Sequence, residues 1–265
     1  MQVLALKTSL IKPNDDLAAV LIQAIEQQKL RLNNGDILAL SSKAVAAAEG
    51  CFVDMKMVSA SKGAKELGRK YSLEPEFAEL ILKEADKVFG GVEKAILTLK
   101  NGALAINAGV DHKNTPRGYA ALWPSNPQQS AETLQKEIKW RLGKKVGVLL
   151  VDSSVAPLRL GTRGVAIGVA GFKPIKDCRG ERDIFQKPLF ITRHAIADDL
   201  ASAAHFVMGQ AGEGTPAVLI KGAPVAFAEN VSIDEMKIAP DKCVYMKAFN
   251  VSRKERDKIG SYSSL

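Results

Sequence analysis

The stretch that decides the fold class is Val146-Gly147-Val148-Leu149-Leu150-Val151-Asp152-Ser153-Ser154. Small and apolar residues come first, and polar residues follow them. A short apolar run bounded by polar residues is typical of a buried strand, although periodicity alone does not separate such a run from a buried helix segment. We therefore expect residues 146–151 to form a strand in the interior of a sheet, with Asp152 at its end.

Helix-like and strand-like patterns are mixed along the rest of the chain. Asp15-Asp16 precedes apolar residues at helical spacing, so residues 15–29 are predicted as an amphipathic helix behind an acidic N-cap. Further helices are predicted over 60–72, 75–88, 130–142 with Ser130 as N-cap, and 197–208, and further strands over 36–40, 92–99, 103–107, 165–169 and 216–221. No repeat or low-complexity linker interrupts the sequence, which favours one α+β or mixed α/β unit.

The composition is that of an ordinary globular protein. Hydrophobic residues make up 46% and charged residues 25%, and no apolar run has the length of a membrane span. The N-terminus lacks the residue order of a signal peptide, and the three cysteines are widely spaced without a C-x-x-C motif. We therefore expect a cytoplasmic protein with no membrane partner, no disulfide framework and no cysteine zinc site.

The net charge of +8 favours polyanionic partners such as nucleotides or phosphorylated substrates. One basic cluster lies at 253–258, but acidic residues interrupt it. We expect a solvated helix or tail there rather than a nucleic-acid-binding arm.

Two apolar runs each lead to a carboxylate. The run Ala105–Val110 ends at Asp111, as the run 146–151 ends at Asp152. A single carboxylate at a strand end is more often a turn former or a helix cap than a catalytic group. Two converging carboxylates near a hydroxyl such as Ser153 are, however, the hard oxygen ligands that magnesium or manganese requires. The sequence leaves both interpretations open.

A glycine-rich segment, Met208-Gly209-Gln210-Ala211-Gly212-Glu213-Gly214-Thr215-Pro216, follows the predicted helix 197–208. Small residues would allow backbone N–H groups to approach phosphates. The segment has no G-K-[ST] ending and is therefore not a P-loop, so a flexible connection between a helix and a strand is the alternative. No Ser/His/Asp order and no H-E-x-x-H pattern indicates a hydrolase, and we expect His194 and His205 to be packing or capping residues.

Taken in order, these segments resemble the coenzyme F-420-0:L-glutamate ligase family. The matching segments are Leu10-Ile11-Lys12 before Asp15-Asp16-Leu17; Ile37–Lys43 leading to Ala48-Glu49-Gly50; Asn107–Asp111 with Asn114; Asp152-Ser153; Gly164–Gly171; and Ala197–Leu200 through Gly214–Ala217. They span about residues 9–222. The resemblance implies a γ-glutamyl ligase-like fold of two intimately packed subdomains in a single domain over 1–265, with a C-terminal extension over about 223–265.

The activity that the resemblance implies is GTP-dependent ligation of L-glutamate to the lactyl carboxylate of a phosphorylated deazaflavin. Because a carboxylate is a poor electrophile, the nucleotide would first phosphorylate it to an acyl phosphate, which the glutamate amine attacks. Divalent magnesium or manganese would neutralise the charge of the transferring phosphoryl group. A monovalent cation is a further expected cofactor, and a homodimer the expected assembly.

The resemblance also implies roles for individual residues. The expected catalytic residues are Asp111, Asp152 and Arg159. The expected metal ligands are Asp111, Asp152, Ser153 and Gln210. The residues expected around the nucleotide are Leu10, Ile11, Lys12, Ser42, Lys43, Asn114, Met208, Gly209, Gln210, Ala211, Gly212, Glu213, Gly214 and Thr215.

Several positions depart from the pattern of the family. Ala46-Ala47 stands where the family commonly has Ser-Lys, and Gln210 stands where a glutamate ligand is usual. Arg159 is the arginine retained from an arginine-rich motif. These changes favour two alternatives, a γ-glutamyl ligase for another acceptor, such as a pterin-type folate, and an inactive or regulatory relative. A nucleic-acid-binding protein is a more distant alternative.

Overall fold

The structure is a computed structural model of the chain, and it describes residues 1–249. The chain divides into a unit of Met1–Glu235 and a C-terminal unit that begins at Met236. The C-terminal unit contains helix α7, Val244–Phe249. All features of the candidate active site lie in the first unit. The basic cluster at 253–258 lies outside the described residues.

The first unit is built on a five-stranded mixed sheet with the order β1-β12-β2-β8-β9. Its strands are β1 (Gln2–Leu6), β2 (Ile37–Ser41), β8 (Gly147–Ser154), β9 (Arg163–Ala170) and β12 (Ala217–Lys221). Strands β2 and β8 run parallel, whereas the other neighbours run antiparallel. The carboxyl ends of β2 and β8 therefore meet at the same edge of the sheet.

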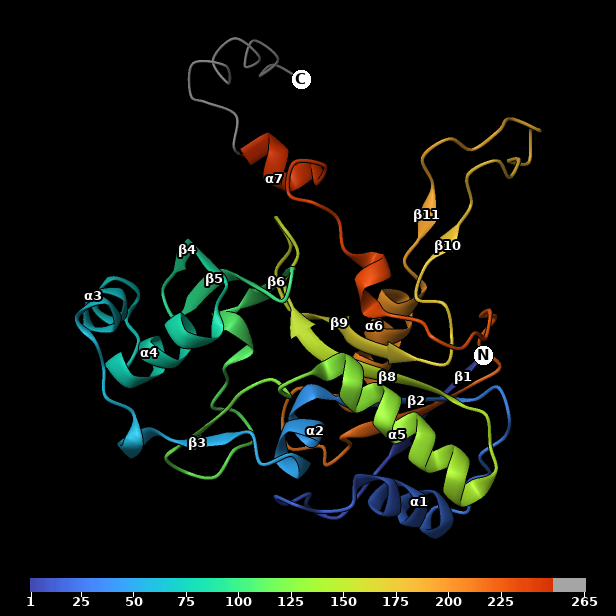
Figure 1. The fold of residues 1–265 in the computed structure, drawn as a ribbon, viewed down its shortest axis with the longest axis horizontal. Helices are drawn as coiled ribbons and strands as arrows, with labels where there is room; N and C mark the ends of the chain where they lie inside the picture. The colour runs from blue at the N-terminus through green and yellow to red at the C-terminus, as the bar shows by residue number, and fades with distance from the viewer. Residues whose placement is uncertain (250–265) are drawn as a thin grey trace. The chain divides into compact units, whose positions relative to one another are not determined.

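Helices cover both faces of this sheet (Figure 1). Helices α1 (Leu17–Gln27) and α5 (Pro127–Leu142) lie on one face. Their apolar side chains join a buried cluster with those of the sheet: Leu21, Ile25, Ala131, Leu134, Ile138, Leu38, Leu40, Val148, Leu150 and Leu219. The alternate strand residues Ile37, Ala39, Leu149 and Val218 are fully buried on the other face, against helix α6 (Ile196–Met208).

A β-bulge in strand β9 interrupts the alternation of its side chains between the two faces of the sheet. Leu150 pairs with Gly168, but Val151 pairs with Ala166, so Ile167 is an extra residue in β9. Gly164 therefore faces α6, where a Cβ atom would lie 2.7 Å from Cβ of His205. Gly168 faces α5 on the opposite side. Without the bulge, these two glycines, four residues apart, would point to the same face.

The close approach at Gly168 predicts that the Gly168→Ala variant is destabilised. A Cβ atom there would overlap the Pro127 carbonyl oxygen and lie 2.8 Å from the Pro127 carbonyl carbon, and neither backbone atom can move without shifting α5. We expect the free energy of unfolding, measured in urea, to fall by about 2–3 kcal/mol. The control is Gly63→Ala in helix α3 (Lys62–Tyr71), where Cβ would meet only side-chain atoms at ordinary distances, the closest at 3.8 Å. Equal stability of the two variants would contradict the prediction.

A second layer of small sheets and helices lies beside the central sheet (Figure 1). It contains helices α3 (Lys62–Tyr71) and α4 (Pro75–Glu84), a three-stranded sheet of β4 (Lys87–Val92), β5 (Ala95–Lys100) and β6 (Ala103–Ile106), and the pair β3 (Phe52–Asp54) and β7 (Tyr119–Ala121). A second buried cluster holds it together, with Phe77, Leu80, Ile81, Ile96 and Val110 among its members. Strands β10 (Lys176–Asp177) and β11 (Arg193–His194) form a separate hairpin.

The structure confirms the predicted α+β fold class and most of the predicted elements. The helices predicted over 15–29, 60–72 and 197–208 and the strands over 36–40, 103–107, 146–151, 165–169 and 216–221 are present, with boundaries shifted by a few residues. His194 lies in β11 and His205 in α6. None of the helices within residues 1–249 is long and apolar enough to cross a membrane.

Two predicted boundaries around residue 90 were wrong. The helix predicted over 75–88 ends at Glu84, because the following segment pairs with β5 as strand β4 and contains two glycines that disfavour a helix. The strand predicted over 92–99 begins at Ala95, because Val92 pairs with Ala95 across a two-residue turn in which Lys94 has a φ of 61°. Both errors come from one hairpin.

Ser130 is not the N-cap of α5. The helix begins at Pro127, and the Asn126 side chain accepts the Gln129 N–H at 3.1 Å. Asparagine as N-cap with proline in the next position is a favourable start to a helix, and it lies before Ser130. The sequence analysis also missed the short helix α2, Ser42–Ala48, which the Ser41 side chain caps by accepting the Ala44 N–H at 3.2 Å.

Candidate active site

The parallel strands β2 and β8 bring polar residues to one edge of the central sheet. Strand β2 ends at Ser41 and leads into α2, so Ser42 and Lys43 follow at once. Strand β8 continues through Ser154, so Asp152 lies within the strand and not after its end as expected. Because successive side chains of a strand point to opposite faces of the sheet, the neighbouring residues Asp152 and Ser153 face opposite sides of β8.

The Asp152 carboxylate is held by two donors from other segments. The Ser42 hydroxyl donates to Oδ1 at 2.8 Å, and the Trp123 indole Nε1–H donates to Oδ2 at 2.6 Å. An ionised carboxylate offers about four lone-pair positions, so two donors leave further directions open for a ligand. The two hydrogen bonds therefore orient the Asp152 carboxylate and leave it able to bind a further ligand.

A left-handed turn delivers Asp111 to the site. Asn107, Ala108 and Gly109 have φ values of 52°, 52° and 73°, a conformation that costs non-glycine residues of the order of 1 kcal/mol. Side chains hold the turn: Asn107 accepts the Ile96 N–H at 2.8 Å, and Thr98 accepts the Ala108 N–H at 3.0 Å. The predicted run 105–110 is therefore not one continuous strand, because β6 ends at Ile106 before this turn.

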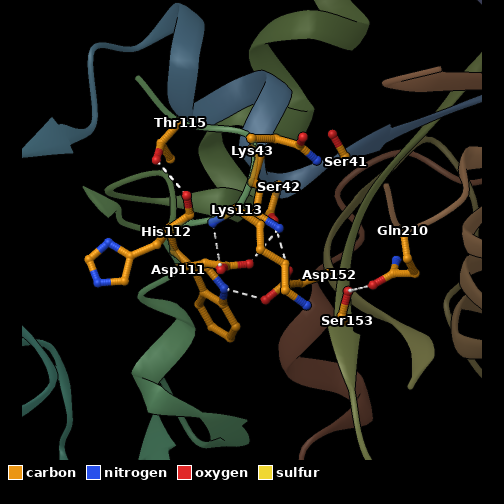
Figure 2. Close-up of polar contacts among 12 residues, drawn as sticks. Ser41, Ser42, Lys43, Asp111, His112, Lys113, Thr115, Asp152, Ser153 and Gln210 are labelled. Atoms are coloured by element: carbon orange, nitrogen blue, oxygen red, sulfur yellow. Dashed lines mark hydrogen bonds and ion pairs between the residues drawn. The ribbon is translucent and has the colours of Figure 1, made fainter. Parts of the chain in front are cut away.

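Asp111 lies next to a lysine of α2. Its Oδ2 is 2.7 Å from Nζ of Lys43, and its Oδ1 accepts the Lys113 N–H at 2.9 Å. Figure 2 shows Lys43 beside both Asp111 and Asp152, with Ser153 and Gln210 at the other side of the group. The two carboxylates come from different segments of the chain, Asp152 from β8 and Asp111 from the turn after β6, and Lys43 pairs with Asp111.

Ser153 faces the glycine-rich loop that follows α6. Its hydroxyl donates to Oε1 of Gln210 at 3.3 Å, and Nε2 of Gln210 lies 2.8 Å from Nε2 of His205. Burial lowers the pKa of His205, which favours the neutral imidazole that can accept this contact.

The loop itself is held in a compact shape by Glu213. Its carboxylate accepts the Ala211 N–H at 2.8 Å, and the backbone N–H groups of Glu213 and Ala211 lower the pKa of Glu213. Asn114 donates to the Ala211 carbonyl oxygen at 3.2 Å, which connects the loop to the segment that carries Asp111. The loop is therefore joined to the site from both sides.

Two adjoining cavities open on these residues. The loop-side cavity, about 410 Å³, is lined by residues 8–11, 41–44, 113–114, 151–153, 205 and 208–216. The α4-side cavity, about 580 Å³, is lined partly by apolar side chains, including Leu73, Phe77, Ile106, Val110 and Leu122. Six residues line both cavities: Ser42, Lys43, Lys113, Asp152, Ser153 and Gln210. We call these six residues the polar seam.

The oxygen donors of the seam, together with the neighbouring Asp111, fit a magnesium-type ion. Asp111 and Asp152 supply carboxylates, Ser153 a hydroxyl and Gln210 an amide oxygen. Within residues 1–249, no group of three or more His, Cys, Asp or Glu side chains could hold a metal by itself. That composition suits an ion that takes one or two protein carboxylates and obtains its other ligands from phosphates and water.

Sequence comparison assigns the family. A sequence model described as F420-0:Gamma-glutamyl ligase matches residues 5–222. The chain belongs to this family. The resemblance stated from the sequence is therefore confirmed.

Curated members of the F420-0:gamma-glutamyl ligase family are similar over most of their length. The chain is 39% identical to the coenzyme F420:L-glutamate ligase of Methanopyrus kandleri, over 80% of this chain and 82% of that protein. It is 40% identical to the enzyme of the same name from Methanocaldococcus jannaschii, over 77% and 82%, and 38% identical to that of Methanococcus maripaludis strain C6, over 86% and 91%. The relatives are ligases, which form amide bonds.

Most of the residues expected from the family line one or both cavities. Those in the loop-side cavity are Leu10, Ile11, Ser42, Lys43, Asn114, Asp152, Ser153 and the loop Met208–Thr215, and Asp111 lines the α4-side cavity. Two expected residues line neither cavity. Lys12 is exposed, and Arg159 lies in the exposed connection between β8 and β9. The structure brings together the carboxylates, the seam and the loop, and it leaves these two cations outside.

The structure places Ala46-Ala47, where the resemblance implies a lysine, away from the polar seam. Both alanines are buried in α2, with 0% and 5% of their surface exposed, whereas Lys43 in the first turn of the same helix reaches the seam. Lys113 and Trp123 were missed by the sequence analysis. Lys113 could have been predicted, because it lies between the expected site residues Asp111 and Asn114. Nothing in the sequence around Trp123 indicates its contact with Asp152.

Proposed function

We propose that this protein joins L-glutamate to the carboxylate of coenzyme F420-0, using GTP and a divalent ion and passing through an acyl phosphate. The family and its relatives, named as F420:L-glutamate ligases, support the ligase activity and this acceptor. The nucleotide, the ion and the intermediate are our inference from the site.

The observation that carries the proposal is the seam shared by two cavities. A ligase of this kind must hold a nucleotide and an acceptor side by side, so that the terminal phosphoryl group lies against the carboxylate. The loop-side cavity, bordered by Gly209, Gly212 and Gly214, suits the nucleotide because backbone groups can approach phosphates there. The α4-side cavity, with its partly apolar lining and Lys94 at its border, suits the phosphorylated, ring-containing acceptor.

The chemistry consists of two displacements. An acceptor carboxylate oxygen attacks the γ-phosphorus of GTP, the bond to the β,γ-bridging oxygen breaks, and GDP leaves. The glutamate amine nitrogen then attacks the acyl carbon, inorganic phosphate leaves, and the nitrogen loses a proton. A divalent ion bound at the seam would neutralise charge on the phosphate oxygens.

The side chains of the chain orient these groups and offset their charge. Asp111, Asp152, Ser153 and Gln210 would hold the ion. Lys43 and Lys113 line both cavities, so their ammonium groups would face the negative oxygens of the phosphoryl group during its transfer. A homodimer remains a prediction, which sedimentation equilibrium at several protein concentrations tests.

Ligation is tested with purified protein, labelled glutamate and magnesium or manganese. GTP is compared with ATP, and coenzyme F420-0 is compared with folates and their monoglutamates. We expect mass spectrometry to find one added glutamyl unit on coenzyme F420-0, together with GDP and phosphate in equal amounts. Product with folate alone would keep the chemistry and overturn the acceptor. No product with any acceptor, in protein shown to be folded, would support the inactive-relative alternative.

A further inference from the structure

Trp123 lies between the two segments that deliver the carboxylates. It follows strand β7 and is 6% exposed, and its Nε1–H donates to Oδ2 of Asp152 at 2.6 Å. An indole N–H can only donate, so the direction of this hydrogen bond is fixed by chemistry. A donor on an ionised carboxylate forms a stronger hydrogen bond than one between neutral groups.

The same ring sets the position of the turn before Asp111. A Cβ atom on Gly109 would overlap the indole nitrogen, so the backbone of the left-handed turn lies directly against Trp123. Glycine is needed at position 109 for two reasons: it adopts the φ of 73° without strain, and it has no Cβ atom to collide with the indole ring. Trp123 therefore contacts the support of Asp111 and the side chain of Asp152.

The ring also lies close to an ion pair whose lysine is buried. Nζ of Lys100 lies 5.4 Å from the centre of the Trp123 ring and 2.5 Å from Oε2 of Glu84. Lys100 is 6% exposed and belongs to β5, in the second layer, whereas Asp152 belongs to the central sheet. The ring is enclosed by elements of both layers, which leaves its N–H little freedom to turn away from Asp152.

We propose that Trp123 is a positioning residue that fixes the orientation of Asp152 and its spacing from Asp111, and thereby sets the affinity of the seam for a divalent ion. The inference rests on the proposed function for its effect on turnover, but the hydrogen bond and the binding of the ion are measured without it. Mutation of a residue that hydrogen-bonds to a metal ligand commonly lowers metal affinity or activity 10- to 100-fold.

The hydrogen bond is tested by NMR of the indole protons. The chain has two tryptophans, and Trp140 on α5 is 81% exposed. The Trp140→Phe variant removes one of the two indole peaks and so assigns the other to Trp123. Adding Asp152→Asn to that variant should move the Trp123 proton upfield, toward the position of the Trp140 peak, because the charged acceptor is lost. An unchanged Trp123 peak overturns the inference.

The positioning role is tested with Trp123→Phe, which keeps an aromatic ring and removes the N–H, and Trp140→Phe is the matched control. Titration with Mn²⁺ in the presence of GTP, followed by electron paramagnetic resonance, should give an affinity about 10- to 100-fold weaker in Trp123→Phe than in the control. In ligation assays kcat should fall by a similar factor, with KM for glutamate unchanged.

Equal Mn²⁺ affinity of the two folded variants, confirmed as folded by circular dichroism, overturns the positioning role whether or not ligation occurs. A lower affinity in Trp123→Phe, in protein that makes no product with any acceptor, supports the inference and overturns the proposed function instead. If Trp123→Phe does not fold, the NMR comparison in the Trp140→Phe background still decides the hydrogen bond, on which the inference depends.

Discussion

The Asp152→Asn variant should lose at least about a thousand-fold in kcat with its fold intact, a loss of transition-state stabilisation of about 4 kcal/mol. The substitution removes one negative charge from the seam and changes little else in size. The fold is expected to persist because an asparagine can still satisfy both neighbours: its oxygen can accept the Trp123 N–H, and its amide can donate to the Ser42 hydroxyl.

Single-turnover ligation followed by mass spectrometry measures this loss, and thermal unfolding checks the fold. Asp86→Asn is the matched control, because Asp86 is exposed and lines neither cavity. Near-normal turnover in Asp152→Asn would show that the ion is held elsewhere. A parallel loss in Asp86→Asn would show instead that the preparation and not the site is at fault.

The Lys43→Met variant should lower kcat by about 100- to 1000-fold, the range found when one fixed donor to a developing charge is removed. Methionine keeps most of the length of the side chain and removes the ammonium group. Lys43 contacts Asp111 at 2.7 Å and lines both cavities, so its charge is placed to act on the nucleotide and on the acceptor.

A double-mutant cycle separates the two roles of Lys43. If its main task is to pair with Asp111, the double variant Lys43→Met, Asp111→Asn should be about as active as the worse of the two single variants. If it acts directly on the phosphoryl group, the losses should multiply. Lys62→Met, at the exposed start of α3, is the charge control. Full activity of Lys43→Met in the ligation assay is the outcome that contradicts the prediction.

The sequence alone predicted the parts of the fold that depend on local pattern. The apolar run 146–151 became β8, and the helical spacing after Asp16 became α1, whose N-cap is Asp16 as expected. The errors occur where local signals compete. Asn126-Pro127 starts α5 before Ser130, and the alanines of α2 were not recognised as a short helix. In these places capping and propensity, which act over a few residues, decided the outcome.

The site was less accessible to sequence reasoning because its contacts join distant positions. Ser42 and Asp152 are 110 residues apart, and Trp123 and Asp152 are 29 apart. Spacing along the chain contains no information about such pairs. The carboxylates themselves could be identified because each follows an apolar run, whereas Trp123, which donates to Asp152, occurs in a segment in which no motif was identified.

The alternation of side chains along β8 restricts where residues can be inserted or deleted. Asp152 meets Trp123 on one side of the strand, and Ser153 meets Gln210 on the other. Inserting or deleting one residue before them would exchange the two sides and break both contacts at once. The bulge at Ile167 gives β9 the same sensitivity, because Gly164 and Gly168 must face different helices. Natural or engineered length variation should therefore concentrate in the exposed connection at 155–162, between two strands whose own lengths are fixed.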